Sequence, residues 1–419
     1  MVAHITQPNR QIATNIIMLL AGAVVTQAFT LVALLLTARY LGIDVYGQYT
    51  ASYTLLSQAV ILLNFGLDTW LLREGAKSKQ LLIQTASDSL LYKLLLAGPW
   101  LILVTIVATY LNPEVYLSAI IWVVALGFIL QSIGTLIQTV FKSQLHNGIT
   151  FWLQIVNSGI LLLLTWWLTQ KSSELAEFVW ARTISLAGMA ALGLYFFKQH
   201  YVFQPSWGHL RGVIRHSAPF FMAEALSYIY ATADVTIIAI WLGKTDVGIY
   251  GPVIVLLNAI QIIPTAIHSV MLPVLSRAYH TAPATTRKPA LLLIAGLGMI
   301  GFGLSSLTFI LAEPLINLLY GPAFHQSAVI LMLLSPIIGL KNLNFAFGTI
   351  LTAINRQRDR VMAQTIIAVA NVGLNLLIVN KYGVMGVALV YLITEFGLVI
   401  GYGSFAWRNS QGFRFLVIR

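Results

Sequence analysis

Four ionisable residues interrupt long apolar stretches of the sequence, namely Glu224, Asp234, Lys341 and Glu395. A charge inside a membrane-spanning helix costs about 2.5–3.5 kcal/mol on insertion scales, so such residues usually face a cavity or a partner. Carboxylates in this setting suit coupling to H+ or Na+, and a lysine can hold a phosphate group as a point charge. We expect these residues to line a charged passage; structural ion pairs between helices are the alternative.

Glu224 and Asp234 lie ten residues apart on one predicted helix. At 100° per residue, their side chains are about 80° apart around the helix axis and about 15 Å apart along it. Both can therefore face one broad side of the helix, toward a central cleft. Lys341 can hold a diphosphate or neutralise one acid. Because three acids outnumber one lysine, an anionic substrate would need protonated carboxylates or positive charge from elsewhere.

Additional positive charge is available near the ends of the apolar stretches. The candidates are Arg39 and Arg182 near the predicted outer side, and Arg73 and Arg277 near the inner side. Interfacial snorkelling explains each arginine equally well.

Amides within the predicted spans are candidates for sugar contacts. They are Gln27, Asn64, Gln131 and Gln138. Hydrogen bonding between helices is an equally good explanation for them.

The composition identifies the solvent around these residues as lipid. Charged residues make up 9% of the 419 and hydrophobic residues 58%, whereas a soluble domain carries about 25% charged residues. The net charge of +11 would suggest nucleic acid in a soluble protein. Here the basic residues lie in short loops, where they indicate topology and contact with anionic membrane lipids. We expect no nucleic-acid partner.

Twelve apolar runs are long enough to cross the hydrocarbon core as helices, which requires about 20 residues each. They are 13–37, 49–72, 89–110, 115–140, 148–169, 177–198, 216–242, 249–275, 289–312, 327–353, 361–380 and 384–407. The predicted fold is an all-α integral membrane protein with two six-helix lobes, related by a pseudo-two-fold axis along the membrane normal. The predicted lobes are residues 1–198 and 216–419, the second with a short cytoplasmic tail. A cytoplasmic linker at 199–215 joins them.

Basic residues predict the orientation of these spans. With the N-terminus inside, 18 of the 24 Lys and Arg residues fall on the cytoplasmic side, Lys93 and Arg360 among them, and five on the other. This asymmetry predicts that both termini are cytoplasmic and that the protein lies in the cell (inner) membrane.

The two halves share a motif, LG-x3-[YV]-G-x-Y. It occurs at Leu41–Tyr49 and again at Leu242–Tyr250, an offset of 201 residues. Each copy lies between the first and second predicted helices of its half, as expected for an internal repeat.

Enzymatic motifs are missing from the sequence, which has no cysteine and no HExxH, DxD or GxSxG. We expect no enzyme, no cofactor and no metal site. Gly296, Gly298, Gly301 and Gly303 fit a dinucleotide-binding spacing. They lie in an apolar span, however, where glycines allow close helix contact.

Several segments carry a resemblance to a known family. They are ARYLGIDVYGQYTASYTLL, GLDTWLLREGAK, YGPAFHQSAVILMLLSP and NVGLNLLIVNKYGVMGVALVYLITEFG. In this order and spacing they resemble polysaccharide-biosynthesis flippases of the Wzx type, within the multidrug/oligosaccharidyl-lipid/polysaccharide exporter superfamily.

The resemblance implies a flippase that moves a polyprenyl-diphosphate-linked oligosaccharide from the cytoplasmic to the outer leaflet. It also implies that Asp234 occupies an acidic position of the seventh helix. A cation-coupled multidrug exporter of the same superfamily and a non-transporting membrane scaffold are the alternatives.

Overall fold

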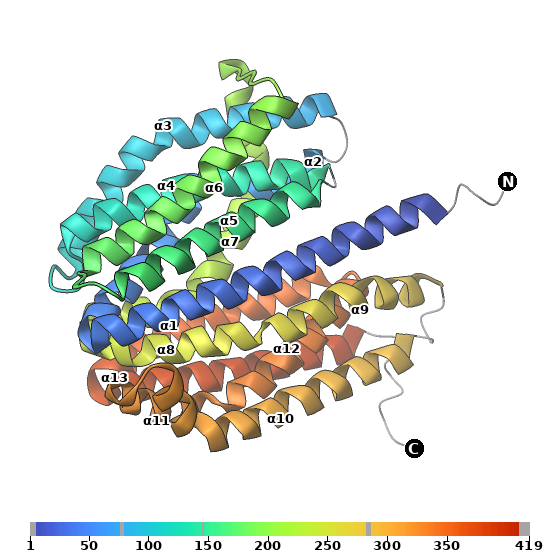
Figure 1. The fold of residues 1–419 in the computed structure, drawn as a ribbon. Coiled ribbons are helices and arrows are strands. Elements are labelled where there is room, and N and C mark those ends of the chain that lie inside the picture. The colour runs from blue at the N-terminus through green and yellow to red at the C-terminus, as the bar shows by residue number, and fades with distance from the viewer. Residues whose placement is uncertain (1–5, 76–78, 145, 282–285, 410–419) are drawn as a thin grey trace, which may run out of the picture. The chain divides into compact units, whose positions relative to one another are not determined.

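The computed structural model describes residues 6–75, 79–144, 146–281 and 286–409 (Figure 1). These residues form helices and short turns, with no strand among them. The helices of the first part are α1 (Thr6–Asn64), α2 (Leu67–Gly75), α3 (Lys79–Leu111), α4 (Ser118–Ser143), α5 (Asn147–Leu168), α6 (Leu175–His200) and α7 (Trp207–Trp241). The second part contains α8 (Lys244–Ile260), α9 (Ile262–Thr281), α10 (Arg287–Leu319), the 3-10 turn η2 (Pro322–Phe324), α11 (His325–Leu334), α12 (Pro336–Ala353) and α13 (Gln357–Asn409).

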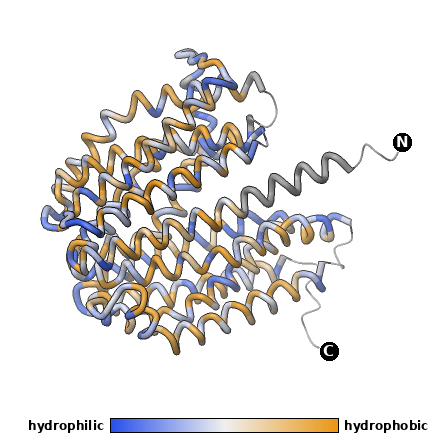
Figure 2. The backbone as a smooth tube through the Cα atoms, viewed as in Figure 1, coloured by the Kyte–Doolittle hydropathy of each residue, from blue (hydrophilic) through white to orange (hydrophobic). Residues whose placement is uncertain are grey.

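Large apolar side chains point outward from many of these helices. Leu377, Met299 and Leu318 are 79%, 73% and 72% exposed, and Figure 2 shows hydrophobic residues along most of the helical length. Exposed leucines at this density are unfavourable in water and favourable in lipid. Helices also satisfy their own backbone hydrogen bonds, as lipid requires. The prediction of an all-α, multi-pass membrane protein is confirmed.

The number of spans depends on how the breaks in the helices are counted. Eight helices of the described chain are long and apolar enough to cross a membrane, and ten are if each of two bent pairs counts as one span. Of these, α1 and α13 each contain two helical segments joined at a glycine with non-helical backbone, Gly42 and Gly383. Counting α1 and α13 as two helices each gives the predicted twelve.

The repeated motif marks equivalent breaks in the two halves. Gly42 has φ 73° and Gly243 has φ 100°, and an L-residue with a Cβ atom rarely adopts this left-handed conformation. Each glycine interrupts the chain between the first two helical segments of its half. The sequence repeat therefore encodes a repeated change of chain direction.

The chain folds into two compact units, Met1–Tyr228 and Ile229–Arg419. In unit 1, α1 packs against α4 and α5, and α6 packs against α4 and α5. The division falls within α7. Residues 201–206 are non-helical and α7 begins at Trp207, so α7 takes up the second part of the segment predicted as a linker. The predicted lobe boundaries stay a prediction.

Unit 2 is built around α12, which packs against α9, α10 and α13. A close helix contact occurs at Gly301 of α10. A Cβ atom on this residue would lie 2.7 Å from Cβ of Asn342 and 3.0 Å from Cα of Gly339, whereas one on Gly303 would meet nothing within 4 Å. The expectation that glycines of this span allow close packing is confirmed at Gly301.

Candidate functional site

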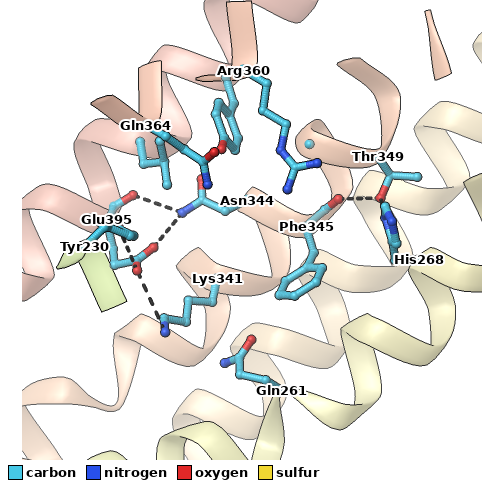
Figure 3. Close-up of a pocket in the computed structure, with 13 residues that line it drawn as sticks. Tyr230, Gln261, His268, Lys341, Asn344, Phe345, Thr349, Arg360, Gln364 and Glu395 are labelled. Carbon is cyan, nitrogen blue, oxygen red and sulfur yellow. Dashed lines mark hydrogen bonds and ion pairs between the residues drawn. The ribbon is translucent and has the colours of Figure 1, made fainter. Parts of the chain in front are cut away.

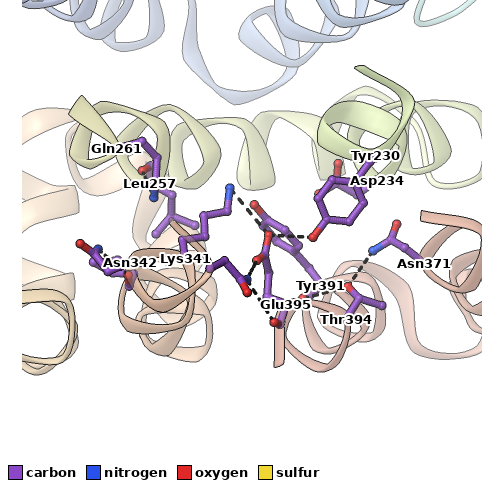
Figure 4. A network of polar contacts seen from close by, with 12 residues as sticks. Tyr230, Asp234, Leu257, Gln261, Lys341, Asn342, Asn371, Tyr391, Thr394 and Glu395 are labelled. Atoms are coloured by element: carbon purple, nitrogen blue, oxygen red, sulfur yellow. Dashed lines mark hydrogen bonds and ion pairs between the residues drawn. The ribbon is translucent and has the colours of Figure 1, made fainter. Parts of the chain in front are cut away.

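Glu395 is the centre of a polar network in unit 2 (Figure 4). Its carboxylate accepts hydrogen bonds from the hydroxyl of Tyr230 (3.0 Å) and from Nδ2 of Asn344 (2.7 Å). Nζ of Lys341 lies 3.9 Å from Oε1 of Glu395. Glu395 is nearly buried, at 2% exposed. A buried carboxylate is tolerated only with such partners, so α7, α12 and α13 are joined by this one charge.

Asp234 belongs to the same unit and also interacts electrostatically with Lys341. The hydroxyl of Tyr250 donates to Oδ2 of Asp234 at 2.6 Å, and the backbone N–H of Val235 donates to Oδ1 at 3.0 Å. Lys341 also lies over the ring of Tyr391, with Nζ 5.2 Å from the ring centroid. Three of the four predicted intramembrane charges, Asp234, Lys341 and Glu395, therefore lie together in unit 2.

A cavity of about 300 Å³ opens beside this network. Its polar lining comes from Tyr230, Gln261, His268, Lys341, Asn344, Thr349, Arg360, Gln364 and Glu395 (Figure 3). Lys341 and Arg360 are cations, and Glu395 is the one anion among these lining residues. The formal charge of the lining is therefore positive even with a neutral histidine.

Arg360 was predicted only as a basic residue of the cytoplasmic side, directly before the span at 361–380. The residue belongs to the first turn of α13, and its Nη1 donates to Oγ1 of Thr352 at 3.2 Å. On another wall of the cavity, Nδ1 of His268 lies 2.6 Å from Oγ1 of Thr349. The cavity thus contains more positive charge than the predicted intramembrane residues alone provide.

Unit 1 contains a second ion pair, which was not predicted from the sequence. Lys93 falls within the predicted span at 89–110 but was counted among the basic residues of the cytoplasmic side; it lies within α3 and is 1% exposed. Its Nζ donates to Oδ1 of Asp68 (2.9 Å), to Oδ1 of Asn64 (3.1 Å) and to the carbonyl of Ser132 (2.9 Å). The ion pair connects α2, α3 and the end of α1 to α4.

Glu224, the fourth predicted intramembrane charge, lies in unit 1 near this ion pair. Oγ1 of Thr69 donates to its Oε1 at 2.5 Å. Glu224, Asp68 and Asn64 line a cavity of about 320 Å³. Glu224 therefore has its described contacts in unit 1 and Asp234 in unit 2, and their common face toward a cleft stays a prediction.

The predicted arginines differ widely in their surroundings. Arg39, Arg73 and Arg277 are exposed. Arg182 instead lies among tyrosines in unit 1, with Nη1 3.4 Å from the hydroxyl of Tyr49 and its guanidinium carbon 4.5 Å from the ring centroid of Tyr53. Stacking on a tyrosine ring stabilises a guanidinium away from bulk water.

The four amide residues predicted as candidates for sugar contacts also differ in their surroundings. Asn64 and Gln131 line the unit 1 cavity. Gln138 contacts Met189 and Gln154, which are helix-to-helix contacts, and Gln27 is exposed. Among the residues that the structure describes, no group of three or more His, Asp or Glu is arranged to hold a metal ion.

A sequence signal did exist for the missed lysine. Lys93 is flanked by Leu90, Leu91 and Tyr92 on one side and Leu94, Leu95 and Leu96 on the other. A cation inside such a run should have been treated as an intramembrane charge. Arg360 follows two other basic residues at the end of a span, and no comparable signal distinguishes it.

Comparison with known proteins places the chain in a family. Residues 36–329 match the family described as "Polysaccharide biosynthesis protein". A relative from Haloferax volcanii, named as the probable low-salt glycan biosynthesis flippase Agl15, is 24% identical over 373 residues, which are 84% of this chain and 74% of that protein.

Two solved structures share the fold. One is an inward-facing multidrug resistance MATE family transporter of the MOP superfamily, with a TM-score of 0.79, 13% identity, and 94% and 96% of the two chains covered. The other is the lipid II flippase MurJ in an inward closed conformation, with a TM-score of 0.71, 15% identity, and 92% and 86% covered. Because the family match extends over most of the sequence, the chain belongs to the polysaccharide biosynthesis protein family.

Proposed function

We propose that this protein is a flippase that moves a polyprenyl-diphosphate-linked oligosaccharide from the cytoplasmic to the outer leaflet of the cell membrane by alternating access. Its product would supply surface polysaccharide biosynthesis. Family membership and the flippase named among its relatives support this proposal. The physical need is clear, because a diphosphate cannot enter hydrocarbon without a polar route.

The observation that carries the proposal is the positive formal charge of the unit 2 cavity. Lys341 and Arg360 outnumber Glu395 in its lining. A guanidinium and an ammonium suit phosphate oxygens, the first through a planar fork of donors and the second as a point charge. In this proposal the two cations hold the diphosphate, while Glu395 keeps Lys341 oriented.

Several finer features belong to the same proposal. The driving ion is H+ or Na+, with Asp234, Glu395 and Glu224 as candidate coupling residues. The lobes are residues 1–198 and 216–419, both termini are cytoplasmic, and the prenyl tail stays among membrane lipids.

A cation-coupled multidrug exporter is the second candidate, and one observation favours it. Asp68 and Glu224 outnumber Lys93 at the unit 1 cavity, and a negative surplus attracts cationic drugs. The MATE transporter fold is also consistent with such a function.

Proteoliposomes that contain the full chain distinguish these functions. A fluorescent polyprenyl-diphosphate disaccharide is incorporated, and its transfer between leaflets is followed by quenching with a membrane-impermeant reductant. The flippase proposal expects faster transfer than in protein-free vesicles, and no uptake of ethidium under an imposed H+ or Na+ gradient. Ethidium uptake without lipid transfer would favour the exporter, and neither activity would favour the scaffold.

A further inference from the structure

The unit 1 cavity has the size and lining of a small-molecule site. Its volume of about 320 Å³ is at the lower end of the range for ligand pockets, about 300–1,000 Å³. Polar side chains reach it from several helices: Asn64 from α1, Asp68 from α2, Gln131 from α4 and Glu224 from α7. Phe128 and Tyr228 add aromatic rings.

Lys93 orients two of these lining side chains through hydrogen bonds. An ammonium group has three hydrogen-bond donors, and Lys93 directs them to Asn64, Asp68 and Ser132. At 1% exposed, it is itself shielded from a ligand. Its role is to hold the side chains of Asn64 and Asp68 in fixed orientations.

The amide of Asn64 is oriented with its donors available. Its Oδ1 accepts from Nζ of Lys93 and, at 2.5 Å, from Oγ of Ser132. No contact of Nδ2 is found among the described residues, so this group can donate to a ligand in the cavity. The network assigns this orientation, because only an oxygen can accept both hydrogen bonds.

The carboxylates supply acceptors. Oδ2 of Asp68 accepts one long hydrogen bond, 3.3 Å from Oγ1 of Thr135, and Oε1 of Glu224 accepts from Thr69. An ionised carboxylate has about four acceptor positions, so both residues can accept more hydrogen bonds. Amide donors, carboxylate acceptors and aromatic rings together suit a sugar, whose hydroxyls both donate and accept and whose C–H faces are apolar.

The charge of the cavity restricts which sugar fits. Lys93 offsets Asp68, which leaves Glu224 as a surplus negative charge. A second carboxylate brought into the same small volume would be repelled, at a cost of several kcal/mol for directly juxtaposed like charges. We infer that the unit 1 cavity binds the sugar portion of the substrate, and that it selects neutral or amino sugars over acidic ones. This inference rests on the proposed flippase function.

Two matched substrates test the inference in proteoliposomes that contain the full chain. One is a polyprenyl diphosphate carrying N-acetylglucosamine, and the other carries glucuronic acid on the same prenyl chain. Wild type is expected to move the first substrate faster. Glu224→Gln should raise the acidic-to-neutral rate ratio about tenfold, because it removes the repelling charge and keeps the shape. The charge-preserving Glu224→Asp should leave the ratio near that of wild type.

Further variants separate this inference from the proposed function. Lys341→Gln should slow both substrates by the same factor, because both carry the same diphosphate. Gln131→Glu adds a negative charge to the lining and should lower the acidic-to-neutral ratio further, which provides a second test if Glu224→Gln does not fold.

Three results would overturn the inference. The first is a wild-type preference for the acidic sugar. The second is an acidic-to-neutral rate ratio that neither Glu224→Gln nor Gln131→Glu changes, although both substrates are still moved. Transfer of neither substrate by wild type would instead overturn the proposed function, and this inference with it.

Discussion

Nζ of Lys93 lies 2.9 Å from Oδ1 of Asp68. The lysine is 1% exposed and the aspartate side chain 21%. Each residue therefore compensates the charge of the other, and together they orient the polar lining of the unit 1 cavity.

Breaking this pair from one side should destabilise the protein. Asp68→Asn leaves the buried Lys93 ammonium without its partner, at a cost of about 3–5 kcal/mol, and Lys93→Met, which leaves the partly exposed Asp68 carboxylate, should cost less. The double variant removes both charges and should recover much of this loss, as expected for coupled residues. Thermal unfolding of the purified protein in detergent measures the effect. Strictly additive losses in the double variant would show that the two charges are not coupled.

Lys341 should matter for transport, with flipping rates compared per amount of folded protein, because its loss also removes a partner of the buried Glu395 carboxylate. Lys341→Gln removes a cation from the unit 2 cavity and a charge-assisted hydrogen bond to phosphate, worth about 1.5–3 kcal/mol, which corresponds to a loss in flipping rate of about tenfold or more. Lys381→Gln is the matched control, because Lys381 is exposed on α13. Equal flipping rates in the two variants would remove Lys341 from the proposed site.

The hydroxyl of Tyr250 should stabilise unit 2 through Asp234. Tyr250→Phe deletes a 2.6 Å hydrogen bond to a carboxylate that is 6% exposed. Loss of a partner by a buried acceptor costs about 1–3 kcal/mol, which should lower the melting temperature. Tyr110→Phe changes a residue that is 87% exposed and should leave the melting temperature unchanged. If the two variants have the same melting temperature, the hydrogen bond does not contribute to stability.

The contact between α10 and α12 should tolerate no added methyl group at Gly301. Gly301→Ala places a Cβ atom 2.7 Å from Asn342, and overpacking of this kind costs about 1–3 kcal/mol. Gly303→Ala, one half-turn along the same helix, meets no atom within 4 Å and should be neutral or slightly stabilising. Detergent melting curves of the two variants compare these effects directly. A loss at Gly303 as large as that at Gly301 would contradict the packing explanation.

Most of the fold could be predicted from the sequence. The predicted spans at 115–140, 148–169 and 177–198 agree closely with α4, α5 and α6. The prediction succeeds because the requirement for about 20 apolar residues in each span is local. It also separated two spans at residues 380–384, within the continuous helical stretch of α13, where Gly383 breaks the helix.

The candidate site was only partly predictable. Composition and apolar length were enough to single out Glu224, Asp234, Lys341 and Glu395, because a charge is conspicuous in an apolar run. Which charges meet depends on how helices distant in the sequence pack. Only the tertiary structure showed that Asp234, Lys341 and Glu395 lie together in unit 2, whereas Glu224 belongs to unit 1.

The sequence by itself determined that lipid surrounds this chain and that helices cross it, since both follow from local hydrophobicity. Only the tertiary structure decided which polar groups Lys93 and Arg360 contact. The reason is physical: the partner of Lys93 is on another helix, 25 residues earlier, and a half-turn rotation of α3, or a shift of one turn along its axis, would separate the two side chains.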